Sequence, residues 1–189
     1  VARGAFPATG LLAEGQLGKS DLVLARDVSG SASRMTSRAW IRWDEKALTV
    51  YIENNVTRGT SFTGNDWGRC EAVEVALRPV VAGKKFPIAV FRGFANGRLD
   101  YGQAKSGPDE PILSDPHGAV YQALAPAEDR WIARLSIPAS LIDVTPAAGM
   151  RFAFNVTARK VKDNLWLMWE ATQAHSYDVD LAGIIELVP

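Results

Sequence analysis

The feature that most constrains the fold of this chain is a succession of short segments in which apolar and polar residues alternate, or apolar residues run together, with turn residues between them. Segments of this kind are typical of an all-β, antiparallel β-sandwich. Turn chemistry agrees, because Asn96-Gly97 is a strong turn dipeptide and Pro138 closes the segment before it. We expect strands over residues 38–43, 47–54, 71–80, 86–94, 118–124, 131–137, 150–158, 165–170 and 182–188.

The sequence indicates one domain of the jelly-roll or immunoglobulin-like class. A chain of 189 residues can bury roughly 70% of the surface that it exposes when unfolded, so a single core suffices. Residues 1–37 are rich in Gly, Ala and Ser, and only 21–27 alternate like a strand. We therefore expect residues 1–37 to pack on or lead into a sandwich formed by residues 38–189.

Charge and composition argue against two classes of partner. Lys plus Arg and Asp plus Glu both number 21, so no overall field attracts the chain to nucleic acid. No apolar run approaches the roughly 20 residues of a membrane helix. Cys70 is the only cysteine, which rules out an internal disulfide. The chain opens with Val1, and we expect it to be a piece of a longer protein.

One predicted strand carries a carboxylate on its less apolar face. Alternation over 71–77 places Val73 and Val75 on a core face and Glu74, between two alanines, on the other. Arg92 interrupts another apolar strand, and Asn155 faces away from the core in a third. These groups offer acceptors and donors suited to sugar hydroxyls. The simpler alternative is that Glu74 and Arg92 form an ordinary cross-strand ion pair.

The tryptophans divide by position. Trp40, Trp43 and Trp131 lie in or beside alternating strands, which favours a packing role. Trp67 lies in the polar loop 60–69, where no periodicity buries it, and this indicates a functional role.

A second exposed indole comes from the segment 165–170. Trp166 and Trp169 lie three positions apart, so in a strand they point to opposite faces and only one can join a site with Trp67. Two parallel indoles can clamp a sugar ring between their faces. The sequence leaves the choice between Trp166 and Trp169 open.

Over residues 39–187 the chain resembles the family 9 carbohydrate-binding modules, which are related to the DOMON-like superfamily. The resemblance is carried by Trp43-Asp44 and the strand LTVYIE, by a loop Trp leading into EAVEVAL, and then by FRGF, WIARLSIP, GMRFAFNV and AGIIEL in that order. Glu71, Arg134 and Ala182 depart from the family pattern, which leaves the identity of the sugar open.

The resemblance implies a non-catalytic module that stacks a sugar ring between Trp67 and Trp169. It assigns hydrogen bonds to Glu74 and Arg92, and it places Asn155 where the family usually has a longer amide. It also implies a mono-, oligo- or polysaccharide ligand, a parent carbohydrate-active enzyme that the module targets to polysaccharide, and an extracellular or periplasmic location.

The resemblance implies no obligatory cofactor, although some members of the family bind structural calcium. Asp21, Asp27 and Asp44 are scattered without the spacing of an oxygen-ligand loop, so the sequence locates no metal site.

Two other functions are open at this stage. A related sandwich superfamily binds haem b for electron transfer through Met and His ligands, and here Met168 with His175 or His117 would be the candidates. A glycosidase or lyase would need paired acids, for which only Glu74 and Glu170 qualify.

Overall fold

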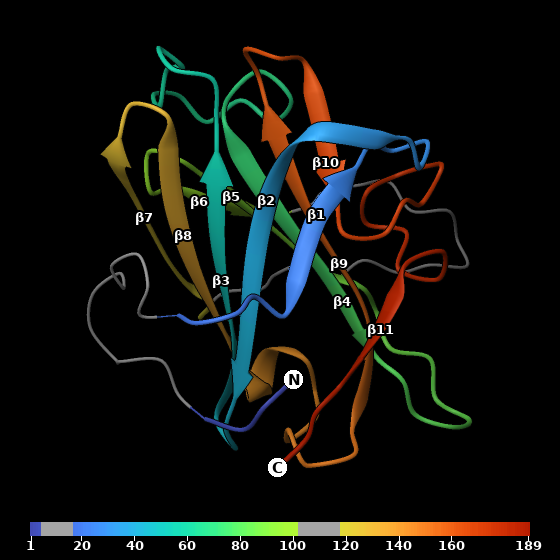
Figure 1. The fold of residues 1–189 in the computed structure, drawn as a ribbon. Coiled ribbons are helices and arrows are strands. Elements are labelled where there is room, and N and C mark those ends of the chain that lie inside the picture. The colour runs from blue at the N-terminus through green and yellow to red at the C-terminus, as the bar shows by residue number, and fades with distance from the viewer. Residues whose placement is uncertain (5–16, 102–117) are drawn as a thin grey trace.

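The computed structural model describes residues 1–4, 17–101 and 118–189 and is built of antiparallel strands (Figure 1). A single 3-10 turn, η1 (Ala139–Leu141), follows the eighth strand, where the sequence places Pro138. The strands are β1 (Leu22–Arg26), β2 (Ala32–Trp43), β3 (Ala47–Asn55), β4 (Ala72–Pro79), β5 (Ala89–Phe94), β6 (Leu99–Tyr101), β7 (Val120–Ala127), β8 (Arg130–Pro138), β9 (Arg151–Lys160), β10 (Leu165–Met168) and β11 (Gly183–Glu186).

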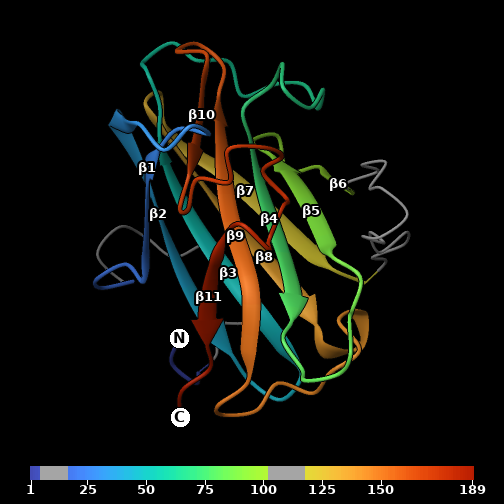
Figure 2. The same ribbon diagram turned by 90° about the vertical axis from the view of Figure 1, so that its right-hand side faces the viewer.

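The strands form two layers with the core between them, which confirms the predicted all-β sandwich in one domain. The strand order is β6-β5-β4-β9-β10-β1-β2-β3-β8-β7, and the first five strands form one layer and the last five the other (Figures 1 and 2). Val75 and Phe154 of the first layer and Val50 and Leu135 of the second belong to the same buried cluster. Burial of these apolar side chains supplies the main driving force for folding.

Strand β9 is the long central strand of the layer that concerns function. Its first half pairs with β11, from Arg151 to Phe154, and its second half pairs with β10, from Thr157 to Lys160. Strand β4 runs along the other side of β9 over its whole length. One layer therefore presents β4 and β9 as a continuous floor, with β10 and β11 covering the two halves of one edge (Figure 2).

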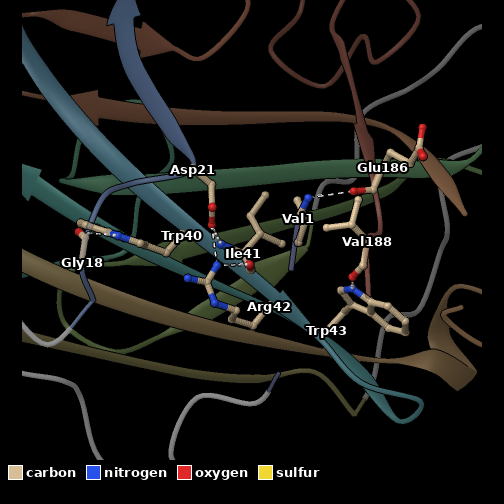
Figure 3. Close-up of polar contacts among 9 residues, drawn as sticks. All are labelled: Val1, Gly18, Asp21, Trp40, Ile41, Arg42, Trp43, Glu186 and Val188. Atoms are coloured by element: carbon tan, nitrogen blue, oxygen red, sulfur yellow. Dashed lines mark hydrogen bonds and ion pairs between the residues drawn. The ribbon is translucent and has the colours of Figure 1, made fainter. Parts of the chain in front are cut away.

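The two termini close the sandwich on one side. The Val1 nitrogen donates to the Glu186 carbonyl at 2.8 Å, and the Val188 amide donates to the Val1 carbonyl at 2.8 Å (Figure 3). Trp43 at the end of β2 donates its indole N–H to the Val188 carbonyl at 3.0 Å. The start of the chain thus links the end of β2 to the segment that follows β11.

Residues before 38 belong to the layers themselves. Strand β1 pairs with β2, and the expected division between residues 37 and 38 falls inside β2. The Asp21 carboxylate accepts from the Ile41 amide at 2.7 Å and from the Arg42 guanidinium at 2.8 Å, and Trp40 donates to the Gly18 carbonyl at 3.2 Å (Figure 3). These contacts fasten the segment before β1 to the outer face of β2.

The predicted strands are present, although their bounds differ. Strand β2 begins at Ala32 instead of residue 38, β5 begins at Ala89 instead of residue 86, and β6 was not predicted. Trp40, Trp43 and Trp131 are buried, which confirms their packing role. Within the described residues, no helix has the length and apolar character needed to cross a membrane.

A close contact between the layers makes Gly93 in β5 essential for packing. A Cβ at Gly93 would lie 2.1 Å from Cε2 of Tyr121 in β7, whose hydroxyl donates to the Phe94 carbonyl at 3.1 Å. We expect Gly93→Ala to lower the free energy of unfolding by about 1–2 kcal/mol, because the Tyr121 ring must leave its position. Urea denaturation measures this, and the loss should shrink in a Tyr121→Ala background, whereas additive losses would contradict the contact.

Candidate functional site

The residues of the candidate site share the outer face of the β5-β4-β9-β10 layer because of the strand register. Glu74 in β4 lies opposite Arg92 in β5 and Thr157 in β9, and Ala76 lies opposite Asn155. Directly paired residues point to the same face of a sheet. Since Val73 and Val75 point into the core, Glu74, Arg92 and Asn155 point away from it, as the sequence predicted.

A cavity of about 320 Å³ opens above this face. It is walled by Trp67 from the loop before β4, by Trp166 from β10 and by Arg92, and it is closed by the segment 174–177. The lining residues are Val28, Trp67, Arg92, Trp166, Met168, Ala174, His175, Ser176 and Tyr177. Two aromatic walls and one cation in a concave site make this the candidate binding site.

The two indoles of the cavity touch each other edge to face. The ring centroids of Trp67 and Trp166 are 5.1 Å apart, and the ring planes are inclined at 65°. The Arg92 guanidinium lies 4.5 Å from the centre of the Trp67 ring, and the Arg159 guanidinium lies 5.1 Å from that of Trp166. Each indole therefore has a cation stacked near it, which helps to hold the ring in place.

Glu74 lies beneath the cavity and fixes two of its walls. Its side chain is 1% exposed, and its carboxylate accepts from Arg92 Nε at 2.7 Å and from the Ser176 hydroxyl. Burial raises the pKa of the Glu74 carboxyl, while the Arg92 charge and the Ser176 hydrogen bond oppose the rise. The carboxylate thus orients Arg92 and Ser176, both of which line the cavity.

Asn155 is buried and binds the backbone of the segment that closes the cavity. Its Nδ2 donates to the carbonyl oxygens of Glu170 at 3.1 Å and Ser176 at 3.2 Å, and its Oδ1 accepts from the Glu170 amide at 3.3 Å. In this structure the amide positions residues 170–176, and it is not among the side chains that line the cavity.

Trp169 is placed differently from Trp67. Its ring lies 6.2 Å from that of Phe154, packs against the main core cluster, and sits so close to Gly183 that a Cβ there would lie 2.3 Å from the indole. Trp169 does not line the cavity, whereas Trp166 does. Of the two tryptophans that the sequence left open, Trp166 is the one beside Trp67.

The segment 174–177 is the part of the site for which the sequence carries no signal. His175, Ser176 and Tyr177 reach the cavity only because the chain folds back over β9 after β10. The position of Trp166 follows from its pairing with Arg159 across β10 and β9, and that register is a long-range property.

The residues proposed as haem ligands have other contacts. Met168 and His175 do line the same cavity. However, the Met168 sulfur accepts the Thr172 hydroxyl at 3.9 Å, and the His175 ring stacks on Tyr177 with 4° between the planes. Both side chains would have to leave these contacts to bind iron, so the arrangement does not fit haem ligation. His117, the other candidate, lies outside the described residues.

The aspartates considered for calcium accept hydrogen bonds from the protein. Asp27 accepts from the amides of Ser29 and Ser31, Asp44 accepts from those of Lys46 and Ala47, and Asp21 binds Arg42. In the part of the chain that the structure describes, no group of three or more His, Cys, Asp or Glu residues is arranged to hold a metal ion.

Comparison with solved structures identifies the fold. The chain superposes on a family 9 carbohydrate-binding module from Caldicellulosiruptor kristjanssonii in complex with glucose, with a TM-score of 0.72, 14% identity, and coverage of 99% of this chain and 93% of that one. The cellotriose complex of a family 9 module from the same organism gives a TM-score of 0.72 and 14% identity, with 100% and 92% coverage. No protein-family model and no curated protein matches the sequence. The chain therefore shares the fold of the family 9 carbohydrate-binding modules.

Proposed function

We propose that this chain is a carbohydrate-binding module that holds a saccharide in the cavity between Trp67 and Trp166. The observation that carries the proposal is that two indoles line one cavity together with Arg92, which the buried Glu74 holds by an ion pair. The likeness to modules solved with glucose and cellotriose supports it.

The chemistry of the cavity suits a neutral sugar. The C–H face of a pyranose can pack on an indole, and its hydroxyls can bind the Arg92 guanidinium, the Ser176 hydroxyl and backbone groups of the segment 174–177. Because Glu74 already accepts hydrogen bonds from Arg92 and Ser176, the Arg92 guanidinium is oriented as a donor and the Ser176 oxygen as an acceptor before the ligand arrives.

A clamp around a sugar ring requires the indoles to separate. With ring contacts of roughly 3.5–4.0 Å on each side, a pyranose needs about 7–8 Å between two parallel indoles, which exceeds the present 5.1 Å between the centroids of Trp67 and Trp166. We infer that the loop carrying Trp67 shifts outward when the ligand enters, or that the sugar stacks on one indole only.

We also propose that the chain is not itself an enzyme but targets a parent enzyme to polysaccharide. Glu74 is buried in hydrogen bonds to Arg92 and Ser176, and Glu170 is exposed with its backbone bound by Asn155. Neither acid is placed as one of two carboxylates flanking a bond in the cavity. Release of reducing sugar from a polysaccharide by the purified chain would contradict this part of the proposal.

Isothermal titration calorimetry with glucose, xylose, cellobiose and xylobiose tests the binding proposal. We expect a dissociation constant of about micromolar to millimolar for at least one of them, since each stacked ring or neutral hydrogen bond contributes roughly 1 kcal/mol. Glu74→Gln should weaken binding severalfold, because Arg92 loses its charged partner, while the exposed Glu45→Gln should bind like the wild type. A folded chain that binds none of these sugars at millimolar concentration would overturn the proposal.

A further inference from the structure

A second cavity lies on the same sheet face, at the other end of β4. Its volume is about 610 Å³, and its floor is a row of directly paired residues, Arg78 in β4, Ala153 in β9 and Ile184 in β11. Figure 2 shows β4 and β11 on the two sides of β9 at this level. The remaining lining residues are Pro79, Val80, Val81, Gly83, Lys84, Lys85, Val179, Asp180 and Ala182.

This cavity is separate from the one lined by tryptophans. A small apolar cluster packs on the sheet between them, formed by Ala76, Ile88, Val90, Ala153 and Val179 with Tyr177 against it. The segment 174–177 lines the first cavity and Val179, Asp180 and Ala182 line the second. The two cavities therefore have no lining residue in common.

Arg78 is a buried cation, and one nitrogen of its guanidinium has no hydrogen-bond partner among the described residues. The residue is 9% exposed, and its Nη2 forms an ion pair with Asp180. Its Nη1 is buried and has no hydrogen-bond partner among the described residues. Buried polar groups are nearly always paired, and a guanidinium nitrogen has two N–H groups to donate. Nη1 of Arg78 therefore needs a hydrogen-bond acceptor that the described part of the protein does not supply.

The surroundings of Arg78 favour an anionic acceptor. Lys84 and Lys85 line the cavity with Arg78, and the carboxylates beside them are Asp180 and, bonded to Lys84 at 3.0 Å, Asp143. Three cationic side chains line the cavity, and Asp180 is the one carboxylate among its described lining residues. A hydrogen bond from a guanidinium nitrogen to a carboxylate is charge-assisted and stronger than one between neutral groups.

The rim of the cavity adds an apolar component. Val80, Val81 and Ile184 are 45%, 41% and 44% exposed and all line the cavity. Exposed branched side chains beside a cation suit a small organic anion that has C–H surface as well as charge, in preference to an inorganic ion.

We propose that this second cavity binds the carboxylate of an acidic sugar, with Arg78 as its main partner. The carboxylate of a uronic acid accepts a hydrogen bond from Nη1 of Arg78, and the sugar ring packs on Val80, Val81 and Ile184. Asp180 competes for the same guanidinium. This site goes beyond the proposed neutral-sugar cavity and does not depend on Trp67 or Trp166.

Calorimetry with sodium glucuronate at low ionic strength tests the proposal, with glucose, acetate and sulfate in parallel. We expect Arg78→Met to weaken glucuronate binding at least tenfold, because the charged donor to the carboxylate is lost. We expect Asp180→Asn to strengthen it severalfold, because the competing negative charge is removed. Opposite effects of the two variants would support the site, and the gain in Asp180→Asn does not depend on whether Arg78→Met folds well.

Controls separate this site from the first cavity. Trp67→Ala should leave glucuronate binding unchanged, while Arg78→Met should leave glucose binding unchanged. Equal binding of acetate or sulfate and glucuronate would overturn the acidic sugar as ligand. Unchanged or weaker glucuronate binding in Asp180→Asn would overturn the role of Arg78.

Discussion

Trp166→Ala is expected to weaken glucose binding at least tenfold, which is a loss of about 1.4 kcal/mol or more. The indole of Trp166 lines the candidate cavity, and its ring centroid lies 5.1 Å from that of Trp67. Its removal therefore takes away one aromatic surface and the support of the other. Calorimetry or the change in tryptophan fluorescence on titration with glucose measures the loss, and Trp166→Phe should retain part of the affinity.

Trp169→Phe is the matched control for this variant. A phenyl ring keeps the contact with Phe154, and Trp169 does not line the cavity, so we expect wild-type affinity for glucose. If Trp169→Phe lost the binding and Trp166→Ala kept it, the second wall would be Trp169, as the resemblance implied. Wild-type binding of glucose by both Trp67→Ala and Trp166→Ala would show that these two indoles do not form the sugar site.

A second large effect is expected from Lys160, whose ammonium group is enclosed between the two layers. The residue is 1% exposed, and Nζ donates to the Ser37 hydroxyl at 2.8 Å and to the Asn55 carbonyl. Burial lowers the pKa of Lys160 from 10.5 to about 8, although the charges of Glu71 and Asp163 oppose this. Folding at neutral pH therefore carries the cost of enclosing this charge.

The sign of the pH dependence follows from proton binding. Between pH 8 and pH 10.5 the unfolded chain keeps a proton on Lys160 that the folded chain has lost, so stability rises with pH. We expect this group to raise the free energy of unfolding by about 2.5 kcal/mol between pH 7 and pH 10. Burial raises the pKa of the Tyr121 phenol, which works in the opposite direction near pH 10.

Comparison with Lys160→Met isolates the contribution of the lysine. Urea denaturation at pH 7, 8.5 and 10 should show the difference in unfolding free energy between variant and wild type changing by about 2.5 kcal/mol. The exposed Lys46→Met should follow the wild-type profile at every pH. Parallel profiles for Lys160→Met and wild type would show that the ammonium group is not destabilised in the fold.

The polar floor of the site could be predicted because it depends on local alternation. Glu74 is flanked by alanines in a strand whose other face is Val73, Val75 and Leu77, and this pattern is enough to orient it. The position of Arg92 beside it agrees with the cross-strand pair that the sequence suggested. What alternation could not reveal is that Glu74 would be buried under Ser176, which is 102 residues away in the chain.

By itself, the sequence determined the sandwich, most of its strands and the face on which each side chain lies, because these follow from a period of two residues along each strand. Only the tertiary structure decided which tryptophan joins Trp67, since that depends on how β10 registers with β9. It also brought the segment 174–177 over the cavity and left Arg78 in β4 with an unpaired donor, across β9 from β11. The register of β10 on β9 and the path of the chain over the cavity depend on long-range contacts, which no local sequence pattern reveals.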